Sequence, residues 1–197
     1  MLSACAALID ELGYDGITTT LIAERAGVAV GSLYQFFPDK RAVVQALTTR
    51  NLDTYAADIR LRLAGVKLEH WWDAVDTALD CYVQMYLHVP GFAKIRFGDV
   101  VDMRLMDADR ENNLVVSDRL IALLTDRFDI EGEEVKLPVT VAVQAVDGIL
   151  NLAFHHKLYP PDVVVTEARR IVRGYLAGAL GTPGDPLVGD VPAQPKH

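Results

Sequence analysis

The chain has little of what secreted, membrane-anchored or catalytic proteins usually carry. It contains only two cysteines in 197 residues, too few for a disulfide framework, and we expect Cys5 and Cys81 to be small core residues. Charges interrupt the apolar runs before the roughly 18 to 20 residues that cross a bilayer. No basic residue precedes the apolar stretch before Asp10, so we expect no signal peptide, no membrane partner and a cytoplasmic location.

Catalytic motifs are also missing, because no glycine-rich phosphate loop or nucleophile elbow occurs. Carboxylates gather between residues 99 and 111, but no partner motif on a second helix completes a magnesium site, and two arginines lie among them. His155 and His156 are adjacent, whereas two metal ligands on one helix face are four residues apart. We therefore predict that the protein is not an enzyme and has no metal or cofactor.

Positive charge is scarce. The formal net charge is -8, and residues 1–50 hold four basic and five acidic side chains. Because contacts to phosphates supply much of the affinity of DNA-binding proteins, this balance is an argument against nucleic acid as a partner.

The apolar spacing is helical almost throughout, and no alternating stretch is long enough to indicate a sheet, so we predict an all-α fold. Residues 1–47 form a small three-helix domain, 48–180 a helical bundle, and 181–197, with four prolines, a disordered tail. The expected helices are 2–12, 19–26, 30–37, 40–64, 71–87, 92–97, 114–128, 138–156 and 164–180.

The N-terminal domain has the pattern of a helix-turn-helix. Gly27 separates two helices that are too short to be stable alone, and the first helix supplies a surface on which they pack. Thr18 caps the first of the pair, and Asp39 caps the helix that follows them. Such a pair places its second helix in the major groove of DNA.

These residues resemble the N-terminal signature of the tetracycline-repressor (TetR) family. The resemblance covers residues 2 to about 47 and rests on Thr18-Thr19, Ile22 to Val28, Gly31 to Tyr34, Phe37-Pro38 and Lys40. It implies a homodimer that binds a pseudo-palindromic operator of double-stranded DNA, most often as a repressor released by a small apolar or amphipathic molecule. The alternative is an all-α adaptor of the same fold that binds a protein partner.

The resemblance also implies which residues contact DNA. Base edges are assigned to Val30, Gly31, Ser32 and Gln35, and phosphates to Thr19, Thr20, Tyr34 and Lys40. Glutamine can bond adenine through two atoms, which suits Gln35; Val30 is equally well explained as a half-exposed surface residue. The hydrophobic positions of this domain, assigned to its core, are Ala23, Ala26, Val28, Leu33 and Phe37.

Two departures from the family pattern bear on binding. Ala29 stands where the family usually has Ser or Thr, so the cap of the recognition helix is missing. A basic arm before the first helix is absent from this chain, and we expect weak DNA binding that falls steeply with salt.

The C-terminal part is expected to dimerise and to bind the effector. Helix 138–156 is apolar on most of its circumference and helix 164–180 carries an apolar stripe, which suits a four-helix dimer interface; a monomeric bundle is the alternative. We expect aromatic, methionine and a few polar side chains in the middle of the chain to line the ligand site, although such residues can equally belong to the core. The candidates are Trp72, Tyr82, Met85, Tyr86, Phe97, Met103, Met106, Asp147 and Asn151.

Overall fold

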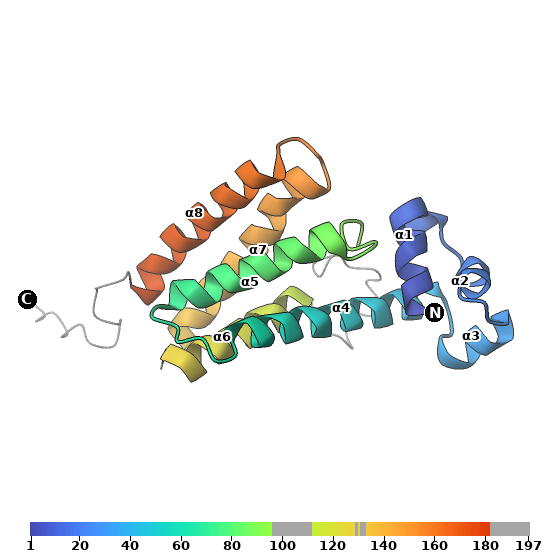
Figure 1. The fold of residues 1–197 in the computed structure, drawn as a ribbon, viewed down its shortest axis with the longest axis horizontal. Helices are drawn as coiled ribbons and strands as arrows, with labels where there is room; N and C mark the ends of the chain where they lie inside the picture. Colours follow the sequence, from blue (N-terminus) through green and yellow to red (C-terminus); the bar gives the residue numbers. More distant parts are fainter. Residues whose placement is uncertain (96–111, 129, 131–132, 182–197) are drawn as a thin grey trace, which may run out of the picture.

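The computed structural model describes residues 1–95, 112–128, 130 and 133–181. Those residues form eight helices and no strand, which confirms the all-α fold. Helices α1–α3 make a small unit at one end of an elongated molecule, and α4 runs from it into a bundle with α5–α8 (Figure 1). The helices are α1 (Leu2–Gly16), α2 (Thr19–Arg25), α3 (Val30–Phe36), α4 (Lys40–Leu63), α5 (Trp71–His88), α6 (Asn112–Phe128), α7 (Glu133–Phe154) and α8 (Pro161–Leu180).

Local signals set the helix boundaries of the small unit. Thr18 Oγ1 accepts a hydrogen bond from the backbone N–H of Leu21 at 3.2 Å, and Asp39 Oδ1 accepts one from Ala42 at 2.9 Å, so both predicted caps are confirmed. Gly27 has φ +67°, a left-handed conformation that allows the sharp turn between α2 and α3.

A separate hydrophobic core holds the three short helices to the start of α4. Ile95, which follows α5, reaches into this core from the C-terminal part of the chain. The other buried members are Cys5, Ala6, Leu8, Ile9, Ile17, Ile22, Ala23, Leu33, Val43, Val44 and Leu47.

Ala29 occupies the N-cap position of α3 with extended backbone (φ −64°, ψ 140°) and forms no side-chain cap. Ala29→Ser is expected to raise the free energy of unfolding by about 1 kcal/mol, because a hydroxyl there accepts an N–H of the first turn. Chemical denaturation followed by circular dichroism measures the change. Thr18→Ala, which removes the cap of α2, is the matched control and is expected to lower the free energy of unfolding. If Thr18→Ala lowers this free energy but Ala29→Ser does not raise it, the prediction is contradicted.

Helix α4 joins the two parts of the molecule. Its 24 residues span about 36 Å, long enough to take part in both cores. Val43, Val44 and Leu47 belong to the small N-terminal core, whereas Leu52 and later apolar residues of α4 belong to the core of the bundle. Helix α4 is therefore a direct connection between the bundle and the helix-turn-helix.

The bundle is built around α7, which packs most extensively against α8 and then against α6. Trp71, at the start of α5, is fully buried and donates its indole N–H to the carbonyl of Gly181 at 3.0 Å. This bond fixes the end of α8 to the beginning of α5.

The largest differences from the expected boundaries lie in the C-terminal part. Helix α7 begins at Glu133, not at residue 138, so Pro138 lies inside the helix, where its missing N–H removes one helical hydrogen bond. Helix α8 begins at Pro161, a residue favoured in the first turn. In place of a helix at 92–97, a hydrogen-bonded turn links Gly91 to Ile95, and Phe97 lies outside the described residues.

One segment, Val135–Phe154 of α7, is long and apolar enough to cross a membrane by length and composition. Two charged residues, Lys136 and Asp147, interrupt this segment. In the structure it packs against α6 and α8, and 28% of its most apolar window is buried within this chain.

Cys5 and Cys81 are buried free thiols, as predicted. Burial raises the pKa of Cys5 to about 11 and that of Cys81 to about 12. At pH 8, both thiols of the native chain are expected to react with Ellman's reagent on the order of a hundredfold more slowly than in denaturant, because the thiolate is the reactive form. The absorbance of released thionitrobenzoate measures this, and rapid labelling of either cysteine in the native protein would contradict it.

Candidate nucleic-acid interface and internal cavity

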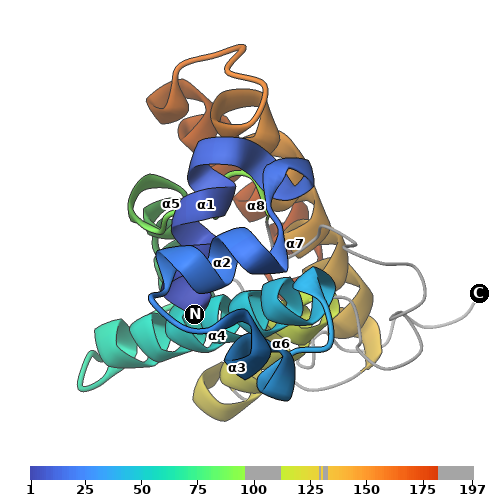
Figure 2. The same ribbon diagram turned by 90° about the vertical axis from the view of Figure 1, so that its right-hand side faces the viewer.

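Helix α3 presents most of its surface to solvent. Leu33 is its one buried residue, while Ser32, Tyr34 and Gln35 are exposed and Val30 is half-buried against the small core. Figure 2 views the molecule from this end, with α2 and α3 toward the reader. The predicted base-reading residues therefore share one accessible helix, and Gly31 allows close approach because a Cβ there would meet nothing within 4 Å.

Two of the predicted phosphate contacts are brought together. The Thr19 Oγ1 and Tyr34 hydroxyl oxygens lie 2.9 Å apart, joining α2 to α3, and Tyr34 is 51% exposed. Thr20 is exposed beside them. Adjacent hydroxyls on neighbouring helices can bond one phosphate together while fixing the angle between the helices.

Lys40 is placed differently from an open surface cation. Its ammonium donates to the carbonyls of Tyr14 and Ile17 at 3.1 and 3.2 Å and lies 4.5 Å from the centre of the Tyr14 ring. Lysine has three N–H donors, so one is left for a phosphate. The structure therefore adds a positioning role that the sequence did not indicate, in which Lys40 fixes the α1–α2 connection beside α4.

The scarcity of cations at this end of the molecule extends to Arg25. Both terminal nitrogens of its guanidinium donate to Glu11, each at 2.8 Å, and this hydrogen bonding lowers the pKa of the Glu11 carboxyl. The charge of Arg25 is thus matched within the domain. Ser32, Tyr34 and Gln35, which were predicted to contact DNA, carry neutral side chains.

Two residues of this region differ from expectation. Val28, assigned to the core, is 37% exposed in the turn that follows Gly27, so its assignment to the core was wrong. Phe36 was not singled out, yet it is 69% exposed on the last turn of α3. It belongs to the same accessible helix as the predicted base-reading residues.

A small apolar cavity lies inside the bundle, within a hollow whose total space, open solvent included, is about 610 Å³. We call it the inner cavity. Its two hydroxyls already have protein partners: Tyr55 donates to the carbonyl of Ala78 at 3.1 Å, and Tyr82 donates to Asp147 Oδ1 at 2.6 Å. Its wall consists of Tyr55, Val75, Ala78, Leu79, Tyr82, Val116, Leu120, Leu124, Val139, Ala142, Val143, Val146, Val172 and Leu176.

Among the predicted ligand residues that the structure describes, only Tyr82 lines the inner cavity. Met85 and Tyr86 are buried in the bundle core outside its wall, and burial raises the pKa of the Tyr82 hydroxyl. Asp147 borders the cavity only through Tyr82. Trp72 and Asn151 also lie outside the wall; Phe97, Met103 and Met106 are outside the described residues.

Comparison with known proteins bears on both parts of the chain. Residues 1–47 match the family described as bacterial regulatory proteins of the tetR family, and residues 69–180 match the tetracyclin repressor-like C-terminal domain. The chain belongs to the tetracycline-repressor (TetR) family. It is a transcriptional regulator, not an enzyme, and the predicted family is confirmed.

Individual relatives agree with this membership. A TetR-family transcriptional regulator from Streptomyces coelicolor is 36% identical, with a TM-score of 0.78 over 91% of this chain and 96% of its own. The uncharacterized HTH-type transcriptional regulator YvdT of Bacillus subtilis is 35% identical over 81 residues, which are 41% of this chain. The class A tetracycline repressor from transposon 1721 of Escherichia coli is 50% identical over 40 residues, 20% of this chain.

The matched regions span only 18% of the class A tetracycline repressor and 40% of YvdT. The chain therefore spans less than half the length of each of these curated relatives. None of the matched proteins supports the alternative of a protein-binding adaptor.

In this TetR-family protein, a row of aromatic rings leads from the inner cavity toward the DNA-binding domain. Tyr82 contacts Tyr86 and Phe92 at ring-centre distances of 5.4 and 5.7 Å, and Phe92 lies in the turn after α5. In the same turn the backbone N–H of Gly91 donates to Asp10 Oδ1 at 3.2 Å, and Lys94 Nζ donates to the Asp10 carbonyl at 2.6 Å. The turn thus connects the cavity wall to α1.

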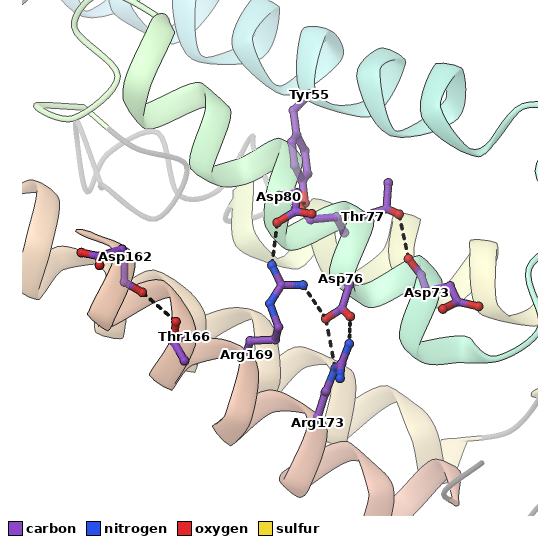
Figure 3. Close-up of polar contacts among 10 residues, drawn as sticks. Tyr55, Asp73, Asp76, Thr77, Asp80, Asp162, Thr166, Arg169 and Arg173 are labelled. Carbon is purple, nitrogen blue, oxygen red and sulfur yellow. Dashed lines mark hydrogen bonds and ion pairs between the residues drawn. The ribbon is translucent and has the colours of Figure 1, made fainter. Parts of the chain in front are cut away.

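An ionic cluster fixes the other wall of the cavity. Figure 3 shows Asp76 and Asp80 of α5 facing two arginines of α8. Arg169 donates to Asp76 at 3.0 Å and to Asp80 at 2.6 Å, and Arg173 pairs with Asp76. Because α5 and α8 both contribute to the cavity wall, these pairs hold its shape on that side.

Proposed function

We propose that this TetR-family regulator is a cytoplasmic homodimeric repressor that binds a pseudo-palindromic operator and leaves it when a small apolar or amphipathic molecule occupies the inner cavity. The observation that carries the proposal is the exposed face of α3, with Ser32, Tyr34 and Gln35 free to meet a groove while Leu33 anchors the helix. The second helix of such a motif reads base edges in the major groove.

The contact between the cavity and α1 supports release by a ligand. A molecule that enlarges the inner cavity displaces Tyr82 and the rings behind it, and these rings adjoin the turn that binds Asp10. Helix α4 provides a second connection, since Tyr55 lines the cavity and Val44 lies in the N-terminal core. A ligand that prefers the displaced arrangement lowers operator affinity by its difference in affinity for the two arrangements.

Selection of bound duplexes from a random library at low salt tests the DNA-binding part of the proposal. We expect an enriched inverted repeat whose affinity falls steeply as salt is raised. No enrichment, or an affinity insensitive to salt, would contradict it. Because the test uses no ligand, it stands apart from any test of the effector.

Gln35→Ala is expected to weaken binding to the selected repeat by about 1 to 3 kcal/mol and to relax the preference at one base pair of each half-site, since a bidentate base contact is lost. Tyr34→Phe is expected to lower affinity for all sequences alike, because its hydroxyl faces a phosphate. Fluorescence anisotropy with matched and mismatched duplexes measures both. Gln84→Ala on α5 is the control; equal losses in all three variants would contradict the assignment.

A further inference from the structure

A second hollow adjoins the inner cavity on the side of α4. It is a groove between α4 and α6 of about 1110 Å³ including open solvent, and we call it the α4–α6 groove. Tyr55, Val116 and Leu120 line both spaces, so the two meet across one shared wall. The floor of the groove is apolar and includes Ala56, Ile59 and Leu123.

The rim of the groove is positively charged in a chain whose net charge is -8. Arg60, Arg119 and Arg127 line it together with a single carboxylate, that of Asp126. Arg119 is committed within the protein, donating to the Leu52 carbonyl and to Asp53, each at 3.3 Å.

The other two arginines are more available. Arg127 contacts its sequence neighbour Asp126 at 3.4 Å on the exposed surface, an interaction that contributes little. Arg60 is exposed and has no ion pair with any other described residue at 4.0 Å or less. Arginine presents a planar set of N–H donors that matches a carboxylate through two hydrogen bonds.

The two spaces therefore differ in polarity: the inner cavity is apolar and the α4–α6 groove is basic. In the inner cavity the hydroxyls of Tyr55 and Tyr82 are bonded to protein oxygens, so a buried charged group would find no partner there and would be costly. At the groove the charge is basic and open to solvent. A ligand that fits both has an apolar tail and an anionic head.

We infer that the effector is an anionic amphiphile whose carboxylate lies at Arg60 and Arg127 in the α4–α6 groove and whose tail passes Tyr55 and Leu120 into the inner cavity. This inference rests on the proposed function, because it names the ligand of the same cavity. It also places the head group against α4, the helix that leads to the DNA-binding domain.

Isothermal titration calorimetry of the full chain with decanoate, decanol and decylamine tests the inference. The three probes share a tail and differ in the charge of the head. We expect decanoate to bind most tightly and decylamine most weakly. Failure of decanoate to bind, or equal dissociation constants for decanoate and decanol, would overturn the inference and leave DNA binding by the chain unaffected.

Substitutions locate the two ends of the ligand. Arg60→Gln is expected to weaken decanoate binding roughly fivefold, and Arg60→Gln with Arg127→Gln more than tenfold, with decanol unchanged. Arg62→Gln is the matched control, since Arg62 lies on the same helix and pairs with Asp58 at 3.1 Å outside the groove. An equal effect of Arg62→Gln would show that general charge and not the groove determines binding, and would overturn the assignment.

Ala142→Phe fills the inner cavity and is expected to abolish binding of decanoate and decanol alike. Circular dichroism and thermal unfolding of this variant establish that it folds, and Val143→Leu, a smaller increase on the same wall, keeps the test available if it does not. Decanoate that binds both filled variants with unchanged affinity would be held at the surface only, which would overturn the inferred path into the cavity.

Discussion

Replacing Gly91 by alanine is expected to lower the free energy of unfolding by about 2 to 3 kcal/mol, because the added methyl group meets both a left-handed backbone and a close contact. Gly91 has φ +73°, and an added Cβ would lie 2.7 Å from the carbonyl oxygen of Ala6 and 3.1 Å from a side-chain carbon of Ile9. Both neighbours belong to α1 and are buried in the N-terminal core. Neither can move without displacing the contact between α1 and the turn after α5.

Urea denaturation followed by circular dichroism measures the loss of stability, and Gly65→Ala separates its two causes. Gly65 has φ +72°, but a Cβ there would meet nothing within 4 Å. Gly65→Ala should therefore show only the cost of the left-handed backbone, about 1 to 2 kcal/mol. Equal losses in the two variants would contradict the close packing of Gly91 against α1.

Gly91→Ala also has an expected effect on regulation. The substitution forces the turn away from Asp10, which accepts from the Gly91 N–H and, through its backbone carbonyl, from Lys94. If this contact transmits the effect of the ligand, the variant binds the operator with an affinity that changes less when the ligand is added. Anisotropy titrations of the operator with and without the ligand measure this coupling as a ratio of dissociation constants.

The DNA-binding domain was predictable from sequence because its signals are local. Thr18 and Asp39 cap helices within three residues of themselves, and Gly27 makes its turn with its own backbone. Each of these choices is determined by neighbours in the chain, so reading the sequence in order was sufficient. The partner of Lys40 was missed because Tyr14 lies 26 positions away.

The wall of the inner cavity differs from the residues favoured by the sequence for a related reason. Aromatic and methionine residues of α5 were favoured because such side chains often line ligand sites, whereas aliphatic residues such as Val143 and Val146 of α7 form much of the wall. When a helix is apolar on every side, its sequence does not indicate which face lines a cavity. That face is determined by the packing of the neighbouring helices. The contact between Asp10 and Gly91, 81 positions apart, is equally beyond any local pattern.

A glutamate in the apolar stripe of α8 is expected to have the largest effect on assembly. Ile171 and Tyr175 are four residues apart on one face of α8 and are 45% and 44% exposed, while the adjoining face, with Val172 and Leu176, is buried. Val141 and Leu152 on the neighbouring α7 are also large, apolar and exposed. Two such helices from each subunit would bury these side chains in the four-helix interface that we propose for the dimer.

Ile171→Glu is expected to raise the dissociation constant of the dimer roughly a hundredfold, about 3 kcal/mol, because two-fold symmetry places an unpaired carboxylate on both sides of the interface. Size-exclusion chromatography with light scattering should then show one subunit mass at micromolar concentration, and affinity for an inverted repeat should fall with it. Leu61→Glu on α4 changes another exposed leucine away from this face and should leave the dimer intact. A dimer that survives Ile171→Glu and dissociates with Leu61→Glu would move the interface from α7 and α8 to α4.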